Sequence, residues 1–397
     1  MVKKIYQVGG CVRDKLLGIE YNDIDFVAVG YTQLDFSHLE CIGKDFPVFL
    51  SENGNEIALA RVERKVANGY NGFTANTINV SLEEDLKRRD LTINSIAYDE
   101  LTDTYIDPYN GKEDIKNKIL RHTSDAFKED PLRVLRLARF KAKFPEFKIA
   151  KETKEFVKSM KNELKYLQKD RVYKEIKKVF ELEYSEVFFE TLHELEVLEV
   201  LFSNIYNLTK CKENNIYHQE ENVFVHTMMV LKELKNESEL LKATAIFHDI
   251  AKPDMYEKSE GANAGGHDNP KFVKPLIDIQ LSQKLEKRML MLIQNHLKIY
   301  NLSNMKASKI ATFFESYRKD KELFEAQLIF ARADSKGRIS DTKEFLDEKI
   351  LKNIFDNISK YSPVSWIQSQ ENKPSGNAIK QHIHNVNIVI VKLLYQE

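Results

Sequence analysis

The stretch that decides the fold lies near the amino terminus and reads KIYQVGGCVRDKLLG over residues 4–18. It is followed by DIDFVAVG over residues 23–30. The runs Lys4–Val8 and Ile24–Val29 have the composition of strands, and glycines mark the turns beside them. We expect the first strand to lead through a glycine turn into a short helix.

The glycine turn could bind phosphate. Gly9 and Gly10 let the backbone approach an anion closely, and the start of the following helix offers free N–H groups. Arg13 could add bidentate contacts to a triphosphate. Taken alone, a Gly-Gly turn between a strand and a helix is more often only structural.

Two carboxylates favour the catalytic interpretation of this turn. Asp23 and Asp25 are two residues apart at the start of the second expected strand, so both side chains should lie on one face. Adjacent carboxylates repel each other, and a hard cation such as Mg²⁺ removes the conflict. Two Mg²⁺ could activate an attacking hydroxyl and stabilise a leaving pyrophosphate. An isolated Asp-x-Asp would instead be taken as a solvated turn.

The rest of the chain is expected to be mostly helical. Ala58–Arg64 and Thr77–Val80 look like further strands, and helical periodicity dominates from Asp130 onward. A length of 397 residues suggests two to four domains. We therefore predict an α+β fold with a small mixed β-sheet first, divided at residues 1–118, 119–200, 201–345 and 346–397.

The composition is that of a soluble globular protein, with 42% hydrophobic and 30% charged residues. The net charge of −1 gives no global basic field. Three widely spaced cysteines suggest a reduced compartment, and no apolar run approaches the roughly 18 residues of a membrane span. A cytoplasmic protein without a membrane segment is expected.

A basic helix is predicted to follow Asp130. Arg133, Arg136 and Arg139 step by three and so share one broad face. A carboxylate accepts from an amino group and a guanidinium donates to ring nitrogen and carbonyl acceptors, so together they could match the base edge of cytosine or adenine. The alternative is a helix cap at Asp130, paired with Arg133 on a solvated helix.

Histidines cluster farther along the chain, with five of the ten between His218 and His296. His226 lies in a helical stretch, His248 and Asp249 are adjacent at a helix end, and Asp334 follows later. Imidazole and carboxylate together suit Mn, Fe, Ni, Co or Mg, and such a metal could activate water against a phosphate ester. A lone buried histidine, by contrast, is usually only packed and hydrogen-bonded.

Four ordered motifs resemble the bacterial class II tRNA nucleotidyltransferase and poly(A) polymerase family of the polymerase β superfamily. They are GGCVRD with DID, DLKRRDLTIN (85–94), DPYNG (107–111) and EDPLRVLRLARF (129–140). The resemblance implies a nucleotidyltransferase head followed by a helical neck, with Mg²⁺ on Asp23 and Asp25. It implies addition of C, C and A to tRNA from CTP and ATP, by a monomer or homodimer. By resemblance, Asp130 and Arg133 read the base, and the other nucleotide contacts are Gly10, Arg13, Arg89, Arg136 and Arg139.

The histidine region resembles the HD phosphohydrolase superfamily and the carboxyl-terminal part of the multifunctional subgroup of these nucleotidyltransferases. The match covers His226, His248, Asp249 and Asp334. It implies an HD body with phosphatase and 2′,3′-cyclic phosphodiesterase activity and a second divalent metal, Ni, Mn or Co, followed by a helical tail. The sequence GHDNP around His267 differs from the Gly-His-Glu usual in the wider family, so a structural remnant is the alternative.

Several other functions stay open at this point. A poly(A) polymerase would use the same head chemistry, and CC-only or A-only adding enzymes are further relatives. An HD hydrolase with an RNA-binding head and a non-catalytic RNA chaperone are alternatives from other classes.

Overall fold

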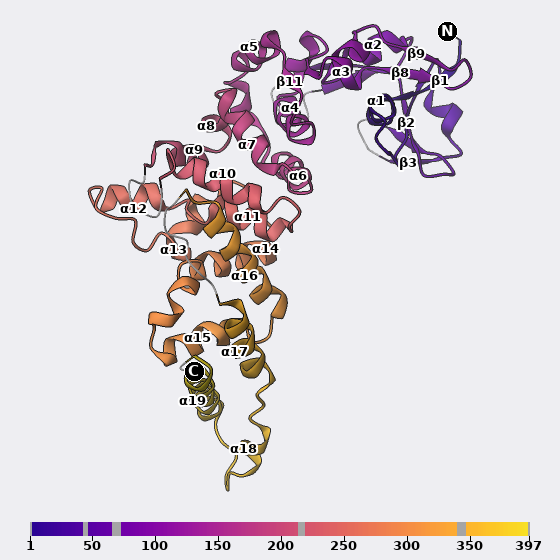
Figure 1. Ribbon diagram of the computed structural model, residues 1–397. Coiled ribbons are helices and arrows are strands. Elements are labelled where there is room, and N and C mark those ends of the chain that lie inside the picture. Colours follow the sequence, from indigo (N-terminus) through magenta and orange to yellow (C-terminus); the bar gives the residue numbers. More distant parts are fainter. Residues whose placement is uncertain (1, 43–46, 66–72, 213–218, 340–346, 396–397) are drawn as a thin grey trace. The chain divides into compact units, whose positions relative to one another are not determined.

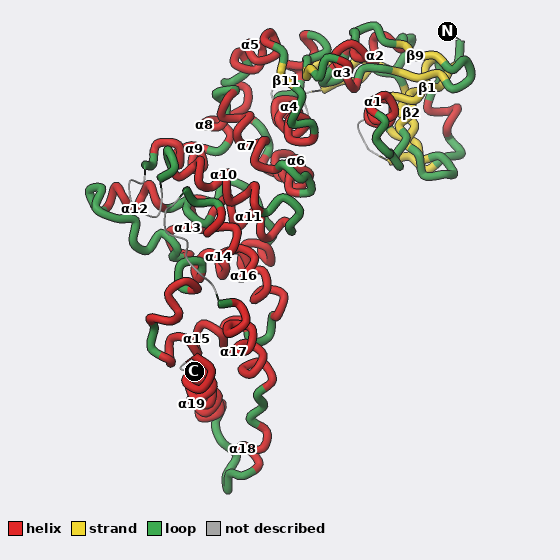
Figure 2. Tube along the Cα trace, viewed as in Figure 1, coloured by secondary structure: helices red, strands yellow, loops and turns green. Residues whose placement is uncertain are grey.

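The computed structural model of the chain describes residues 2–42, 47–65, 73–212, 219–339 and 347–395 (Figure 1). These residues form two compact units, which divide between Phe202 and Ser203. Every described strand belongs to the first unit, and the second is helical (Figure 2). Of the helices in the described residues, none combines the length and apolar composition that crossing a bilayer requires.

The first unit contains a seven-stranded sheet in the order β3-β4-β5-β2-β1-β8-β9. Strands β2 and β5 are parallel and the other neighbours are antiparallel. This confirms the predicted α+β fold with a small mixed sheet. The strands of this sheet are β1 (Lys4–Val8), β2 (Asp25–Val29), β3 (Glu40–Ile42), β4 (Val48–Leu50), β5 (Glu56–Leu59), β8 (Ala97–Asp99) and β9 (Thr104–Ile106).

The centre of the sheet is buried on both faces, which explains the continuous apolar run of β2. Val27 and Val29 pack with Val8 on one face. Ala28 points to the other face and packs with Phe36 and Phe49. Successive side chains of a strand alternate between faces, so a run without polar residues indicates burial on both sides.

Two predicted strands differ from the structure. The expected strand Ala58–Arg64 is divided, because β5 pairs with β2 whereas β6 (Val62–Lys65) forms a separate hairpin with β7 (Phe73–Asn76). The expected strand 77–80 is a turn, in which the Asn76 side chain accepts from the Ile78 backbone N–H at 3.0 Å and Asn79 has a φ of 56°. The glycine-containing segment between them lies, through residue 72, outside the described residues.

The helical part of the first unit packs around α4 (Leu132–Lys143), which contacts α6 and α7. Its apolar face is fully buried, including Val134, Leu135 and Leu137. The other elements of the first unit are α1 (Gly10–Leu17), α2 (Leu82–Lys87), α3 (Gly111–Lys116), β10 (Ile119–Leu120), β11 (Lys148–Ile149), α5 (Lys151–Ser159), α6 (Lys169–Phe180), α7 (Ser185–Glu194) and α8 (Leu198–Leu201).

The DPYNG motif forms the start of α3. Asp107 accepts from the backbone N–H groups of Gly111 and Lys112 at 2.7 and 2.9 Å, which satisfies two free donors of the helix start. The positive φ belongs to Asn110, at 57°. Gly111 is needed for a different reason, because a Cβ there would lie 2.2 Å from the carbonyl oxygen of Thr92.

The second unit is built from helices. Helices α10, α11, α14 and α16 pack against one another, and α15, α17 and α19 form another group of contacting helices. The boundaries that we predicted at residues 118, 200 and 345 stay predictions. The helices are α9 (Ser203–Asn207), α10 (Val223–Glu233), α11 (Glu239–Phe247), α12 (Lys252–Lys258), α13 (Pro270–Val273), α14 (Gln283–Asn295), α15 (Ala307–Tyr317), α16 (Lys321–Lys336), α17 (Glu348–Lys360), α18 (Val364–Gln368) and α19 (Gly376–Tyr395).

Candidate functional site

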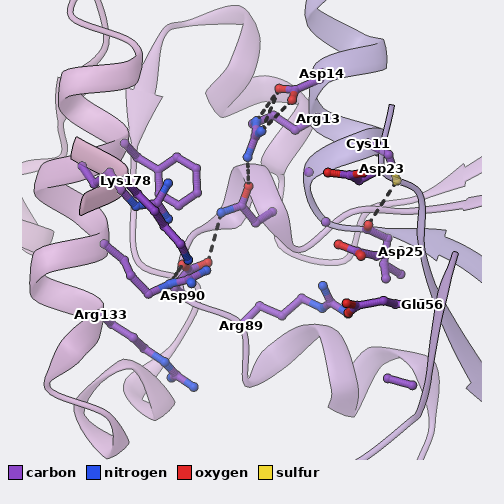
Figure 3. Close-up of a pocket in the computed structure, with 18 of the residues that line it drawn as sticks. Cys11, Arg13, Asp14, Asp23, Asp25, Glu56, Arg89, Asp90, Arg133 and Lys178 are labelled. Carbon is purple, nitrogen blue, oxygen red and sulfur yellow. Dashed lines mark hydrogen bonds and ion pairs between the residues drawn. The ribbon is translucent and has the colours of Figure 1, made fainter. Parts of the chain in front are cut away.

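A pocket of about 920 Å³ opens in the first unit between the glycine turn, the start of β2, the end of α2 and helices α4 and α6 (Figure 3). The structure brings together in its lining all nine residues that the sequence predicted for the nucleotidyltransferase site. They are Gly10, Arg13, Asp23, Asp25, Arg89, Asp130, Arg133, Arg136 and Arg139.

The strand register places Asp25 beside the glycine turn. Asp25 is opposite Val8, the last residue of β1, so the turn that follows β1 lies next to the carboxylate. Strand β2 begins at Asp25, one residue later than we expected, and Asp23 lies two residues before its start. Both aspartates nevertheless line the same pocket.

The electrostatics of Asp25 suit a bound cation. The surrounding protein withdraws its carboxylate from bulk water and so raises its pKa, and the nearby charge of Asp23 raises it further. Arg89 acts in the opposite direction and lowers the pKa. Two carboxylates that repel each other in a partly desolvated pocket form an oxygen donor set that fits Mg²⁺.

The sequence reasoning missed a third carboxylate. Glu56 is the first residue of β5, and the parallel pairing of β2 and β5 sets it opposite Asp25. It lines the pocket, and Figure 3 shows it near Asp25 and the Arg89 side chain. Pairing between distant strands is not visible in one sequence, so no local signal could have identified Glu56.

Gly9 is the glycine that this turn requires. Its backbone has φ 79° and ψ −128°, and an added Cβ would lie 3.2 Å from Arg89 Nη1. At Gly10 φ is not positive, and an added Cβ would make only an ordinary contact, 3.6 Å from Arg13 Nη2. The sequence argument singled out Gly10, whose part in phosphate binding stays a prediction.

We expect Gly9→Ala to lower the free energy of unfolding by about 1–3 kcal/mol, because an L-residue is strained in this conformation. The matched variant Gly10→Ala should change it by less than about 1 kcal/mol. Urea unfolding of both variants, followed by circular dichroism, measures the difference. Equal destabilisation by the two substitutions would contradict this assignment of strain to Gly9.

Arg13 joins the glycine turn to helix α4 through a chain of hydrogen bonds. It is buried, donates from Nε and Nη2 to the Asp14 carboxylate at 2.8 Å, and donates from Nη1 to Asn94 Oδ1 at 2.6 Å. Asn94 in turn donates to Asp90 at 3.1 Å, and Arg136 donates to the other oxygen of Asp90 at 2.7 Å. Burial alone would raise the pKa of Asp90, but Arg136 and Asn94 hold it well below its usual range. Asp90 and Asn94 therefore position Arg136 relative to the turn.

Side chains of helix α6 fix the side chains of Asp130 and of helix α4 that line the pocket. Arg171 donates to both oxygens of Asp130, at 3.1 and 2.8 Å, and Glu175 accepts from Arg139 at 2.7 Å. Arg133 donates to the backbone carbonyl of Ala126 at 2.5 Å. Asp130 also accepts from the Leu132 backbone N–H at 3.1 Å, so it caps the start of α4 as our alternative expected, while its ion-pair partner Arg171 comes from another helix. A single sequence does not reveal which acid pairs with which base across helices, so Arg171 and Glu175 were missed.

Arg89 is fixed by a buried carboxylate. Arg88 and Arg89 both pair with Asp85, at 2.7 and 3.1 Å, and Asp85 is fully buried. Arg89 is thereby held near Gly9 and Asp25. Asp85 therefore serves as a buried anchor for both arginines.

The charges around the pocket favour a polyanion. Basic side chains outnumber carboxylates, and an excess of positive charge in a cleft concentrates anions there. The basic residues are Arg13, Arg61, Arg88, Arg89, Arg133, Arg136, Arg139, Lys143, Arg171 and Lys178, and the acidic residues are Asp14, Asp23, Asp25, Glu56, Asp90 and Asp130.

A second candidate site is buried in the helical unit. The structure brings the four predicted residues together and adds two more, His267 and His296. His226, His248 and Asp334 offer one group of ligand atoms, all within 4.8 Å of one another. Asp249, His267 and His296 offer a second such group. The two added histidines belong to the histidine-rich stretch of the sequence, and that enrichment was the available signal.

The four histidines are oriented alike. Each Nδ1 lies within hydrogen-bonding distance of a backbone carbonyl, and since a carbonyl can only accept, each Nδ1 carries the proton. In the neutral ring this leaves Nε2 as an acceptor directed into the cluster, the arrangement found in metal-ligating histidines. The distances are 3.0 Å for His226 to Gly337, 2.8 Å for His248 to Ala245, 2.8 Å for His267 to Ala264 and 2.6 Å for His296 to Ile293.

The two carboxylates complete a donor set that fits a divalent metal. Asp249 Oδ2 pairs with the buried ammonium of Lys252 at 2.8 Å, whereas Asp249 Oδ1 and Asp334 Oδ1 face imidazole nitrogens of His267 and His226, at 3.1 and 3.2 Å. Burial would raise the pKa of Asp334, but Arg338 and His226 hold it well below its usual range. Burial lowers the pKa of His296 to about 3, so this imidazole is neutral and able to coordinate. His226 Nε2 and His248 Nε2 lie 3.2 Å apart, so a single cation could bind both nitrogens.

The sequence matches two protein-family models. Residues 5–121 match the poly A polymerase head domain, and residues 146–208 match the probable RNA and SrmB-binding site of polymerase A. The first match covers the sheet and the glycine turn.

Comparison with known proteins extends the similarity to nearly the whole chain. The multifunctional CCA protein of Shewanella denitrificans is 39% identical over 350 residues, which cover 84% of each chain. That of Actinobacillus pleuropneumoniae is 35% identical over 98% of this chain and 99% of its own. A Thermotoga maritima CCA-adding enzyme in complex with tRNA shares the fold, with a TM-score of 0.64 and 20% identity over all of this chain and 88% of that chain. On the strength of these matches, the chain belongs to the family of multifunctional CCA proteins.

Proposed function

We propose that the chain adds C, C and A to the 3′ end of tRNA from CTP and ATP and releases pyrophosphate. The observation that supports this best is one pocket that unites the Asp23–Asp25 pair, the glycine turn and the basic face of α4. Family membership supports it as well, because the relatives are named for CCA addition.

Asp130 and Arg133 would select the base. Cytosine and adenine share an amino group beside an acceptor ring nitrogen, whereas uracil and guanine present a carbonyl where the amino group would be. The Asp130 carboxylate would accept from the amino group and the Arg133 guanidinium would donate to the ring nitrogen. The bidentate pair with Arg171 keeps the Asp130 carboxylate in one orientation, and the Leu132 backbone N–H also donates to Oδ1, which leaves Oδ2 to accept from a base.

The triphosphate would lie between the glycine turn and the arginines. Gly10 and Arg13 on the turn, together with Arg89, Arg136 and Arg139, would bind its charge. Asp23 and Asp25 would hold Mg²⁺, with Glu56 beside them. When bound, this metal lowers the pKa of the attacking 3′ hydroxyl and stabilises charge on the leaving pyrophosphate.

A single-nucleotide extension assay tests this function. With tRNA that lacks CCA, CTP alone should give two additions, and CTP with ATP should give three. ATP alone should extend only tRNA that already ends in CC. Unlimited A addition without C addition would indicate a poly(A) polymerase, and arrest at CC or addition of A alone would indicate a partial adding enzyme. Absence of pyrophosphate release with every tRNA would favour an RNA chaperone.

The histidine cluster favours a second activity. Four Nε2 atoms and two carboxylates converge there, and the Nδ1 atom of each imidazole is already hydrogen-bonded to a backbone carbonyl. We place a metal-dependent phosphohydrolase in an HD body over residues 201–345, followed by a helical tail. His226, His248, Asp249 and Asp334 would hold a divalent metal together with His267 and His296. Imidazole with carboxylate suits Ni, Mn or Co, and such a metal activates water for attack on a phosphate ester.

Hydrolysis of a 2′,3′-cyclic nucleotide with each metal in turn tests the second activity. We expect hydrolysis with at least one of Ni²⁺, Mn²⁺, Co²⁺ and Mg²⁺. Absence of hydrolysis with all four, on both cyclic nucleotides and phosphate monoesters, would identify the cluster as a structural remnant. Hydrolysis without any nucleotide addition would instead support a hydrolase whose head only binds RNA.

A further inference from the structure

The far end of helix α4 carries a basic residue that the predicted site does not include. Lys143 lines the pocket, four residues beyond Arg139 on the same helix. Its side chain is 31% exposed, and its ammonium donates to Asp14 Oδ2 at 3.2 Å. Lys143 thus joins the last turn of α4 to helix α1, which starts at the glycine turn.

The length of α4 fits an extended nucleotide. Arg133 and Lys143 are ten residues apart, which corresponds to about 15 Å along a helix. If the base is read at Arg133, the other end of the nucleotide lies toward Lys143. Arg13, which contacts the same Asp14 carboxylate, lies against Gly10 of the turn. The order along this wall of the pocket is therefore base, sugar and phosphates.

Positive charge is in excess at the Lys143 end. Burial lowers the pKa of Lys143, and the charge of Arg13 lowers it further. Asp14 is one carboxylate shared by two cations, because its Oδ2 accepts both from Arg13 at 2.8 Å and from Lys143 at 3.2 Å. Arg139 also acts on Lys143, and its own carboxylate partner is Glu175. An anion in addition to Asp14 would balance the positive charges of Lys143, Arg13 and Arg139.

We propose that Lys143 binds the β- and γ-phosphates of the incoming nucleotide, and that Asp14 holds Lys143 and Arg13 in position before the nucleotide arrives. This inference rests on the proposed nucleotidyltransferase function. It gives Lys143 a contact with substrate and makes Asp14 a positioning residue. The ammonium keeps its bond to Asp14 and uses its remaining N–H groups for phosphate, since an ammonium has three donors.

Binding of CTP and CMP in the presence of Mg²⁺, measured by calorimetry without tRNA, tests the proposal. Lys143→Ala should weaken CTP binding about tenfold, the usual loss for one charge-assisted contact, and change CMP binding less than twofold. Lys143→Arg should keep most of the CTP affinity because it keeps the charge. Lys148→Ala is the matched control, because this exposed lysine lies five residues further on and does not line the pocket.

Two results would overturn the proposal. Equal weakening of CTP and CMP by Lys143→Ala would show that the lysine only maintains the shape of the pocket, and unchanged binding of both would show that it has no part in it. Lys143→Gln gives the same comparison if the alanine variant does not fold. If the wild-type protein itself binds CTP no more tightly than CMP, the proposed transferase function fails together with the role of Lys143. If the wild-type protein prefers CTP, only the role of Lys143 is in question.

Discussion

Asp25→Asn is expected to lower the rate of CMP addition to tRNA by about 1,000-fold or more. The substitution keeps the shape of the side chain and removes the charge that would hold Mg²⁺ beside the turn. A loss of this size corresponds to about 4 kcal/mol of transition-state stabilisation, which is reasonable for the metal that acts on both the attacking and the leaving oxygen. Single-turnover extension of tRNA lacking CCA, at saturating CTP, measures the effect.

Glu52→Gln is the matched control for Asp25→Asn. Glu52 is an exposed carboxylate of the same unit that does not line the pocket, so its loss should change the rate less than twofold. Asp25→Asn should also leave hydrolysis by the second unit unchanged. A reduction of less than tenfold in CMP addition would mean that Asp25 does not carry the catalytic metal.

His248→Ala should remove the hydrolytic activity while tRNA extension stays within about twofold of wild type. His248 lies close to His226, Asp249 and Asp334, so its loss affects both groups of ligand atoms. Substitution of residues that merely support metal ligands costs about 10–100-fold, and we expect at least the upper end of that range for a ligand itself. The measurements are the rate of 2′,3′-cyclic nucleotide hydrolysis and the metal content of the purified protein.

The exposed His38, substituted as His38→Ala, controls for loss of an imidazole elsewhere. Asp334→Asn provides a second variant that keeps the side-chain volume and removes the charge. Unchanged metal content and unchanged hydrolysis in His248→Ala would show that the cluster is only packed and hydrogen-bonded. Loss of tRNA extension along with hydrolysis would contradict the division of the two activities between the two units.

The parts of the fold that follow from local pattern were predictable. Strand β1 was predicted at its observed bounds, because a short apolar run ended by two glycines has few alternatives. Strand β2 was predicted one residue too long at its start. The errors at residues 58–64 and 77–80 arose where pairing with distant strands, or a side-chain turn at Asn76, decides the structure. Local composition carries no information about such partners.

The site was predictable where residues lie close in sequence or share a helix face. Asp23, Asp25 and the arginines of α4 belong to that class. Glu56 and Arg171 do not, because each comes near the others only through sheet or helix packing. The chemical roles of all these residues stay predictions, although the structure places them in one pocket.

The pairing of Asp25 with both Val8 and Glu56 also indicates how this region tolerates change. Residues added or removed at the exposed turn between β4 and β5 alter only that turn, provided that β2 and β5 keep their alignment. A single residue inserted into β2 ahead of Val27 would turn the Asp25 side chain to the opposite face of the sheet. Variants with altered length at residues 52–54 should therefore remain active far more often than variants with one residue added at 26.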